Sequence, residues 1–205
     1  MINVSSLNCV LAAYAKLGQV DLAFLTYDEF IQMDVKPNAD TFSYLMEALA
    51  NKQSLSSSEK SPTDYINHDQ GRSTQEEDQV DESSWNTSGS QLKAADSIVS
   101  MMSKLEQEPD PYVLHNHICI LIRSKEIPKA KAMLLDAIKS KQMILLQTFG
   151  HLIHYLLEAK DVKSARKICD WMRTVANEHG DAWKTNRDVV PPQLEKSIYG
   201  KAIKK

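Results

Sequence analysis

A recurring alanine at a fixed spacing is the feature that most constrains how this chain folds. Four segments with the pattern apolar-x-x-alanine end at Ala23, Ala95, Ala130 and Ala165. The last two gaps are 35 residues each, and the first is 72 residues, which is one period plus an insertion of about 37 residues. A constant period of this length is the signature of a repeat architecture. The chain is therefore predicted to contain four similar units.

Each unit is predicted to be a pair of α-helices. Upstream of every alanine lies a set at i, i+3, i+4 and i+7 that is apolar except for His117 in the third unit, and such a set is one face of a helix. In the first unit this set is Leu7, Val10, Leu11 and Tyr14. The alanine lies on a second helix, where its small side chain allows two backbones to approach closely. Because such units cannot bury their apolar faces alone, they are expected to stack into an all-α solenoid.

Turn-forming residues agree with these boundaries. Gly18 is placed to end the first helix in the left-handed conformation. Pro37-Asn38 and Pro109-Asp110 close the first two units, with Asn or Asp able to cap the helix that follows. Asp161 is a candidate cap for the second helix of unit four.

Composition divides the chain into four parts. Residues 1–50 hold unit one and the first helix of unit two, and residues 91–180 hold its second helix and units three and four. Residues 51–90 are rich in serine and acidic residues and are predicted to be disordered, because they lack the apolar surface to order themselves. Residues 181–205, where the period fails, are expected to form a C-terminal cap.

The overall charge excludes a strongly basic nucleic-acid binder. Lys and Arg number 24 against 27 Asp and Glu, giving a net charge of −3. Any RNA must therefore be held by a local groove rather than by the field of the whole molecule. Unpaired and widely separated, Cys9, Cys119 and Cys169 are interpreted as buried thiols in a reducing compartment.

The first residues of the chain carry no targeting signal that we recognise. No apolar window is long enough to cross a membrane, and Met1–Ser6 resembles neither a signal peptide nor a transit peptide. Because Met1 lies close to the first helix with no capping unit before it, we expect the chain to be part of a longer solenoid.

The first unit resembles the pentatricopeptide repeat (PPR) family. The similarity lies in Asn8–Gly18, in Ala23 and Phe30, and in the closing Val35–Asn38. The related tetratricopeptide repeat has a Trp-Leu-Gly-Tyr pattern that is absent here. The resemblance implies a non-enzymatic, P-type organellar protein of plants. Such a protein binds single-stranded transcripts in mitochondria (alternatively chloroplasts) during RNA processing, stabilisation or translation.

The resemblance also implies base-reading residues. In the family, the fifth and the last residue of each repeat read one base. Unit one offers Asn8 and Asn38, which implies a pyrimidine, and unit two offers Ser43 and Asp110, which implies G. Short amide, hydroxyl and carboxyl groups suit the hydrogen-bonding edge of a base. The position that sandwiches the base is occupied by Ser5, Asp40, Tyr112 and Gln147, of which only Tyr112 stacks well.

Units three and four depart from the reader pattern. Unit three offers His115 and Leu145, and unit four offers Gly150 and Gly180, so at most two bases are read. The RNA-contacting residues that we predict are Asn8, Asn38, Ser43, Asp110, Tyr112 and His115. Two functions stay open at this point: an RNA-binding protein, and a protein-interaction scaffold such as one associated with the mitochondrial ribosome.

No catalytic motif is present. The sequence offers no nucleophile elbow and no phosphate-binding glycine loop, so no enzyme, cofactor or small-molecule substrate is predicted. His151 and His154 have a spacing that suits a metal, but no cysteine lies near them in sequence and Glu158 is a distant third ligand. We interpret them as solvated or RNA-facing and predict no metal site. His115 and His117 are expected on different faces of one helix.

Overall fold

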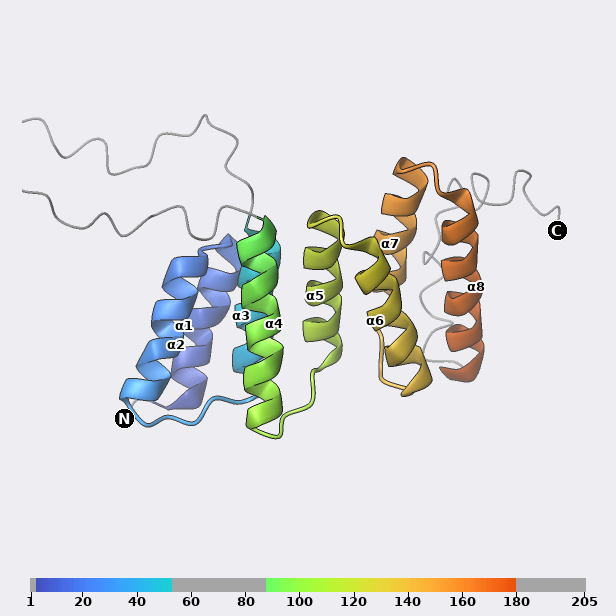
Figure 1. Ribbon diagram of the computed structural model, residues 1–205. Coiled ribbons are helices and arrows are strands. Elements are labelled where there is room, and N and C mark those ends of the chain that lie inside the picture. The colour runs from blue at the N-terminus through green and yellow to red at the C-terminus, as the bar shows by residue number, and fades with distance from the viewer. Residues whose placement is uncertain (1–2, 53–87, 180–205) are drawn as a thin grey trace, which may run out of the picture.

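The computed structural model describes residues 3–52 and 88–179, and every regular element in these ranges is an α-helix. The helices follow one another in a row from the N-terminal end to the C-terminal end (Figure 1). Consecutive helices pair into hairpins, two helices to a unit. The pairs are α1 (Val4–Leu17) with α2 (Val20–Gln32), α3 (Ala39–Asn51) with α4 (Ser88–Lys104), α5 (Pro111–Arg123) with α6 (Ile127–Lys139), and α7 (Leu146–Glu158) with α8 (Val162–His179).

The structure confirms the predicted repeat. The four alanines that define the period lie on α2, α4, α6 and α8, and each is fully buried. In α2, α6 and α8 the alanine is the fourth helical residue, whereas α4 begins four residues earlier relative to its alanine. The all-α solenoid predicted from the spacing is therefore the observed fold.

The first helix of each unit forms the continuous inner row of the stack. α1 packs against α3, α3 against α5, and α5 against α7, while the second helices pack onto the first ones. Two buried clusters result, one centred on α1 to α4 and one on α5 to α8. This arrangement places the fifth residue of one unit beside the start of the next.

Val10 was predicted to lie in the core, and that prediction is wrong. Its side chain is 45% exposed, whereas the equivalent Leu45 and Leu152 are fully buried. The equivalent His117 on α5 contacts Asp96 on α4, which shows that this position faces the second helix of the preceding unit. Within the described residues no unit precedes α1, so Val10 has nothing to pack against.

The predicted helix caps are confirmed. Asn38 Oδ1 accepts the backbone N–H of Thr41 at the start of α3. Asp110 Oδ1 accepts the backbone N–H groups of Tyr112 and Val113 at the start of α5. Asp161 Oδ1 accepts that of Ser164 at 3.0 Å. These bonds satisfy donors that have no partner within the helix.

Gly18 ends α1 as predicted, with φ of 65°. A Cβ at this position would lie 2.6 Å from the carbonyl oxygen of Asn51, so the site needs glycine for its space as well as for its backbone conformation. Five other helix ends use a left-handed residue that carries a side chain: Asp34, Glu106, Lys125, Lys141 and Lys160.

The predicted domain boundaries shift slightly at the insertion. Asn51 is the last residue of α3 and α4 already begins at Ser88, so both ends of the segment predicted to be disordered, residues 51–90, are helical. Its remainder, residues 53–87, and the predicted cap, residues 181–205, lie outside the described residues. In the part of the chain that the structure describes, no helix is both long and apolar enough to span a bilayer.

Candidate nucleic-acid interface

At three successive junctions, the fifth residue of a first helix contacts the start of the next first helix. These residues are Asn8 on α1, Ser43 on α3 and His115 on α5. Their exposed fractions are nearly equal, at 8%, 9% and 8%, as expected for one position in a regular stack. The junctions therefore repeat in geometry while their chemistry changes.

The first junction is an amide and hydroxyl network. Asn8 Nδ2 donates to Asn38 Oδ1 at 2.9 Å, and Thr41 Oγ1 donates to Asn8 Oδ1 at 2.8 Å. An amide nitrogen carries two hydrogens and an amide oxygen has two lone pairs. The side chain of Asn8 therefore keeps one hydrogen on Nδ2 and one lone pair on Oδ1 for a further hydrogen bond. The two predicted readers of unit one thus lie side by side.

The second junction is a hydroxyl–carboxylate pair. Ser43 Oγ donates a hydrogen bond to Asp110 Oδ2, while Oδ1 of the same carboxylate caps α5. The predicted readers of unit two are therefore also in contact. Tyr112 lies two residues after Asp110 and is 59% exposed, so its ring can stack on a base.

The third junction differs in character. His115 Nδ1 lies 2.9 Å from Thr148 Oγ1, and its Nε2 lies 3.7 Å from Cys119 Sγ. Leu145, the second predicted reader, precedes α7 without a side-chain cap. Both ring nitrogens of His115 thus have protein neighbours, which makes it the least available of the predicted RNA-contacting residues.

Burial sets the ionisation of this third junction. Burial, together with a smaller effect of the nearby His151, lowers the pKa of His115 to about 4. Burial also raises the pKa of the Cys119 thiol to about 11, against a smaller opposing effect of Arg123. The imidazole of His115 is consequently uncharged at neutral pH.

The remaining predicted positions are exposed. Ser5, Asp40 and Gln147, which share the helix position of Tyr112, all face solvent. Gly150 has no heavy atom within 4 Å of where a Cβ would lie, so unit four offers open space at its reader position. Its predicted partner Gly180 lies outside the described residues.

The sequence did not reveal that Thr41 and Thr148 take part in these junctions. Each is the third residue of a first helix, and each hydroxyl contacts the fifth residue of the preceding unit. A hydroxyl residue at this repeat position in three of the four units, Ser6, Thr41 and Thr148, was the available signal. In unit three this position is held by Val113, which has no hydroxyl group. At the second junction Ser43 therefore bonds to the side chain of Asp110.

The predictions for the other histidines and the cysteines are partly confirmed. His117 contacts Asp96 at 3.1 Å and so lies on a different face from His115, as predicted. His154 pairs with Glu158 on the same helix. His151 instead contacts Cys119 on α5, with its Nδ1 atom 3.2 Å from the cysteine Sγ. This neighbour was missed because it is distant in sequence.

The prediction of three buried thiols is wrong for Cys9, which is exposed, and only partly right for Cys119, which is half-buried. Cys169 is buried as predicted. Cys9 follows Asn8 on α1 and turns away from the core set of that helix, which explains its exposure.

Comparisons with known proteins agree with this geometry. Residues 2–51 match the model of the PPR repeat family. No curated protein matches the sequence. A solved structure of the pentatricopeptide repeat protein PPR10, a cysteine-substituted form in complex with an 18-nt PSAJ RNA element, is similar with a TM-score of 0.61 and 13% identity, over 98% of this chain and 26% of that chain.

The structure of PPR10 from maize is similar with a TM-score of 0.57 and 14% identity, over 95% of this chain and 26% of that chain. Our chain thus spans about a quarter of the length of these proteins. At such low identity the likeness shows the fold, while the family match covers the first unit and α3. Residues 2–51 therefore match the PPR repeat family, and the described residues as a whole share the helical-repeat fold of the pentatricopeptide repeat protein PPR10.

Proposed function

We propose that this protein binds single-stranded RNA along the row of first helices, with one base at the Asn8–Asn38 junction and the next at the Ser43–Asp110 junction. The observation that carries the proposal is the direct contact within each pair. Two side chains that share one edge can together meet the donors and acceptors of a base. Tyr112 adds a stacking surface beside the second pair.

The charge of the chain indicates how such binding would work. With a net charge of −3, phosphate neutralisation contributes little. Affinity then comes mainly from base contacts and stacking. The logarithm of the binding constant should consequently fall with the logarithm of salt concentration by a slope of only about 0.7 to 1.4, the value for one or two phosphate contacts to a single strand.

Transplanting one junction into another tests the proposal. The triple variant Asn8→Ser, Asn38→Asp and Asp40→Tyr gives unit one the residues of unit two and leaves the net charge unchanged. Fluorescence anisotropy is measured with labelled single strands that differ at one base. The wild type should favour C at the unit-one position, and the triple variant should favour G there.

Asp40→Tyr alone is the matched control, because it adds the stacking ring without changing the readers. It should raise the affinity for every strand and leave the preference for C unchanged. Equal binding of all strands by both wild type and triple variant would contradict base reading. No binding to pooled organellar transcripts would contradict the proposal as a whole.

A protein-interaction scaffold is the second candidate function. A hollow of about 490 Å³ lies between α4, α5 and α6, and its lining includes Val99, Leu114 and Met133. This surface is largely apolar and is built by the outer helices as well as by α5, so it suits a protein partner more than an RNA strand. If RNA binding fails, purification of the tagged protein with its partners is the next experiment.

We extend the proposal to an organelle, mitochondrial or alternatively chloroplast, with a role in RNA processing, stability or translation. Only the family resemblance supports this step. Imaging of the full-length gene product fused to a fluorescent protein tests the location, and crosslinking in cells followed by sequencing of the bound RNA tests the target. A signal confined to the cytosol would contradict the location without affecting base reading.

A further inference from the structure

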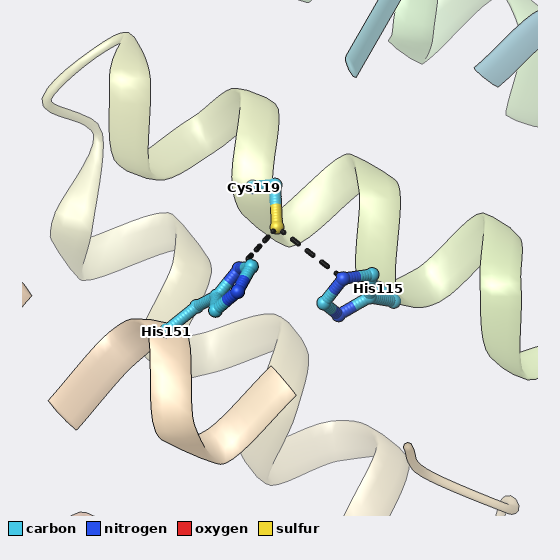
Figure 2. Close-up of side chains that lie close together, drawn as sticks. All are labelled: His115, Cys119 and His151. Atoms are coloured by element: carbon cyan, nitrogen blue, oxygen red, sulfur yellow. Dashed lines mark hydrogen bonds between the residues drawn. The ribbon is translucent and has the colours of Figure 1, made fainter. Parts of the chain in front are cut away.

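Three side chains with metal-binding atoms converge at the third junction. His115 and Cys119 lie four residues apart on α5 and thus on one face of that helix, and His151 reaches them from α7. Figure 2 shows the Cys119 sulfur between the two imidazole rings. Sγ lies 3.2 Å from His151 Nδ1 and 3.7 Å from His115 Nε2. All three ligand atoms lie within 4.8 Å of one another.

These distances are those of a zinc site. Zn–S bonds of about 2.3 Å and Zn–N bonds of about 2.0–2.1 Å at tetrahedral angles place sulfur and nitrogen about 3.6 Å apart. The two observed separations lie on either side of this value. Both sulfur–nitrogen separations therefore suit a zinc ion, and the two nitrogens, which lie within 4.8 Å of each other, would need to lie about 3.3 Å apart in the bound site.

A residue outside the three ligands orients one of them, as in known metal sites. Thr148 Oγ1 contacts His115 Nδ1 at 2.9 Å, which leaves Nε2 directed at Cys119. A partner on the second ring nitrogen is the usual way in which a protein fixes a histidine ligand. A metal binds the neutral imidazole and the thiolate, so binding would release the proton of the thiol.

The three residues are specific to this junction. The other two junctions carry at the same repeat positions residues that cannot form an N₂S site. They are Asn8, Ala12 and Tyr44 at the first, and Ser43, Glu47 and Asn116 at the second. The third junction lacks a good reader pair and holds the ligand set instead.

We propose that His115 Nε2, Cys119 Sγ and His151 Nδ1 bind one Zn²⁺ ion that links unit three to unit four. The cluster of described residues supplies three ligands, so the fourth tetrahedral position takes water or an added ligand. Half-buried Cys119 and exposed His151 give the ion a path from solvent. The site does not depend on RNA binding.

Cobalt substitution tests the site. The full chain is reduced, stripped with a chelator and titrated with Co²⁺. One equivalent should produce a thiolate-to-cobalt charge-transfer band and the intense d–d absorption of tetrahedral cobalt, and Zn²⁺ should displace it. The absence of a charge-transfer band would overturn the proposal.

Variants identify the ligands. Cys119→Ser should abolish the charge-transfer band, and His151→Ala should lower the affinity by roughly 100-fold or more, because each removes a direct ligand. His151 is exposed, so its variant keeps the fold even if a substitution at buried His115 does not. Thr148→Val should weaken binding by roughly 10–100-fold, the usual effect of losing an outer partner.

Matched controls come from the same chain. Cys9→Ser removes an exposed thiol outside the site, and His154→Ala removes the neighbouring exposed histidine. Both should bind cobalt as the wild type does. If His154→Ala and Glu158→Ala abolish binding while Cys119→Ser has no effect, the metal is held by the surface of α7 alone and the proposal is wrong.

Discussion

Asn38 Oδ1 accepts a hydrogen bond from the Asn8 side chain at 2.9 Å and one from the backbone N–H of Thr41 at 3.1 Å. The residue that caps α3 is therefore the residue that holds the fifth position of α1. Asp110 combines the same two roles with Ser43 and α5. At each of these junctions one side chain both caps a helix and is predicted to read a base. Substitutions must therefore be chosen so that the effect on capping is measured separately from the effect on base reading.

The capping role of Asn38 at the start of α3 can be tested by measuring the free energy of unfolding, without RNA. Asn38→Ala should lower the free energy of unfolding by about 1–3 kcal/mol, because it removes the cap and the partner of the Asn8 amide. Asn38→Ser keeps a capping oxygen and should recover much of the loss. Urea denaturation followed by circular dichroism measures both, and equal losses in the two variants would contradict the capping role.

Replacing two of the glycines by alanine should change the stability of the protein in opposite directions. Gly18→Ala should destabilise the protein by about 1–2 kcal/mol or more, because it adds a left-handed alanine and a clash with the Asn51 carbonyl. Gly150→Ala, inside α7 with open space around it, should stabilise by about 0.5–1 kcal/mol. Thermal melts of both variants give the comparison, and a shift in the same direction would contradict it.

The third junction depends on the hydroxyl of Thr148, which is fully buried. Thr148→Val keeps the shape but leaves His115 Nδ1 without a partner, at a cost of about 1–3 kcal/mol in the free energy of unfolding. Thr148→Ser retains the hydroxyl and is the matched control. Denaturation in the presence of a chelator removes any contribution of a bound metal.

Asp161 gives α8 a pH-dependent cap. Hydrogen bonds from Ser164 lower the pKa of this exposed carboxyl below 3.8. The unfolded state therefore binds the proton first, so the stabilisation is complete above pH 3.8 and is lost as the pH falls through the folded pKa.

Asp161→Asn keeps a capping oxygen but cannot titrate. Its melting temperature should lie below that of the wild type at neutral pH and approach it as the solution is acidified. A difference that stays constant or grows on acidification would contradict this role of the carboxylate. Exposed Asp28→Asn on α2 is the control, which should show no such convergence.

Tyr112 is predicted to stack on the base at the second junction. Because its ring is largely exposed, Tyr112→Ala should leave the fold intact and weaken binding of single-stranded RNA by about 1–3 kcal/mol. Tyr112→Phe keeps the stacking face and should bind as the wild type does. Unchanged anisotropy curves for Tyr112→Ala would remove the tyrosine from the interface.

Much of this fold is predictable because it is local and periodic. The helices, their order and the burial of Ala23 and Ala165 follow from apolar spacing, since each unit contacts mainly its neighbours. The caps at Asn38 and Asp110 follow from local hydrogen bonding. Val10 was misplaced because its burial depends on a neighbouring unit, and periodicity within one helix carries no information about that neighbour.

The amino-acid sequence by itself determined the period and the helix pairs, because apolar spacing is local and repeats along the chain. The pairing of Asn8 with Asn38 and of Ser43 with Asp110 was implied by the family resemblance. Only the tertiary structure decided that Cys119 meets His151, 32 residues away and on another helix. Such a contact depends on the distance and rotation between α5 and α7. These are set by the packing of whole helices rather than by any local pattern.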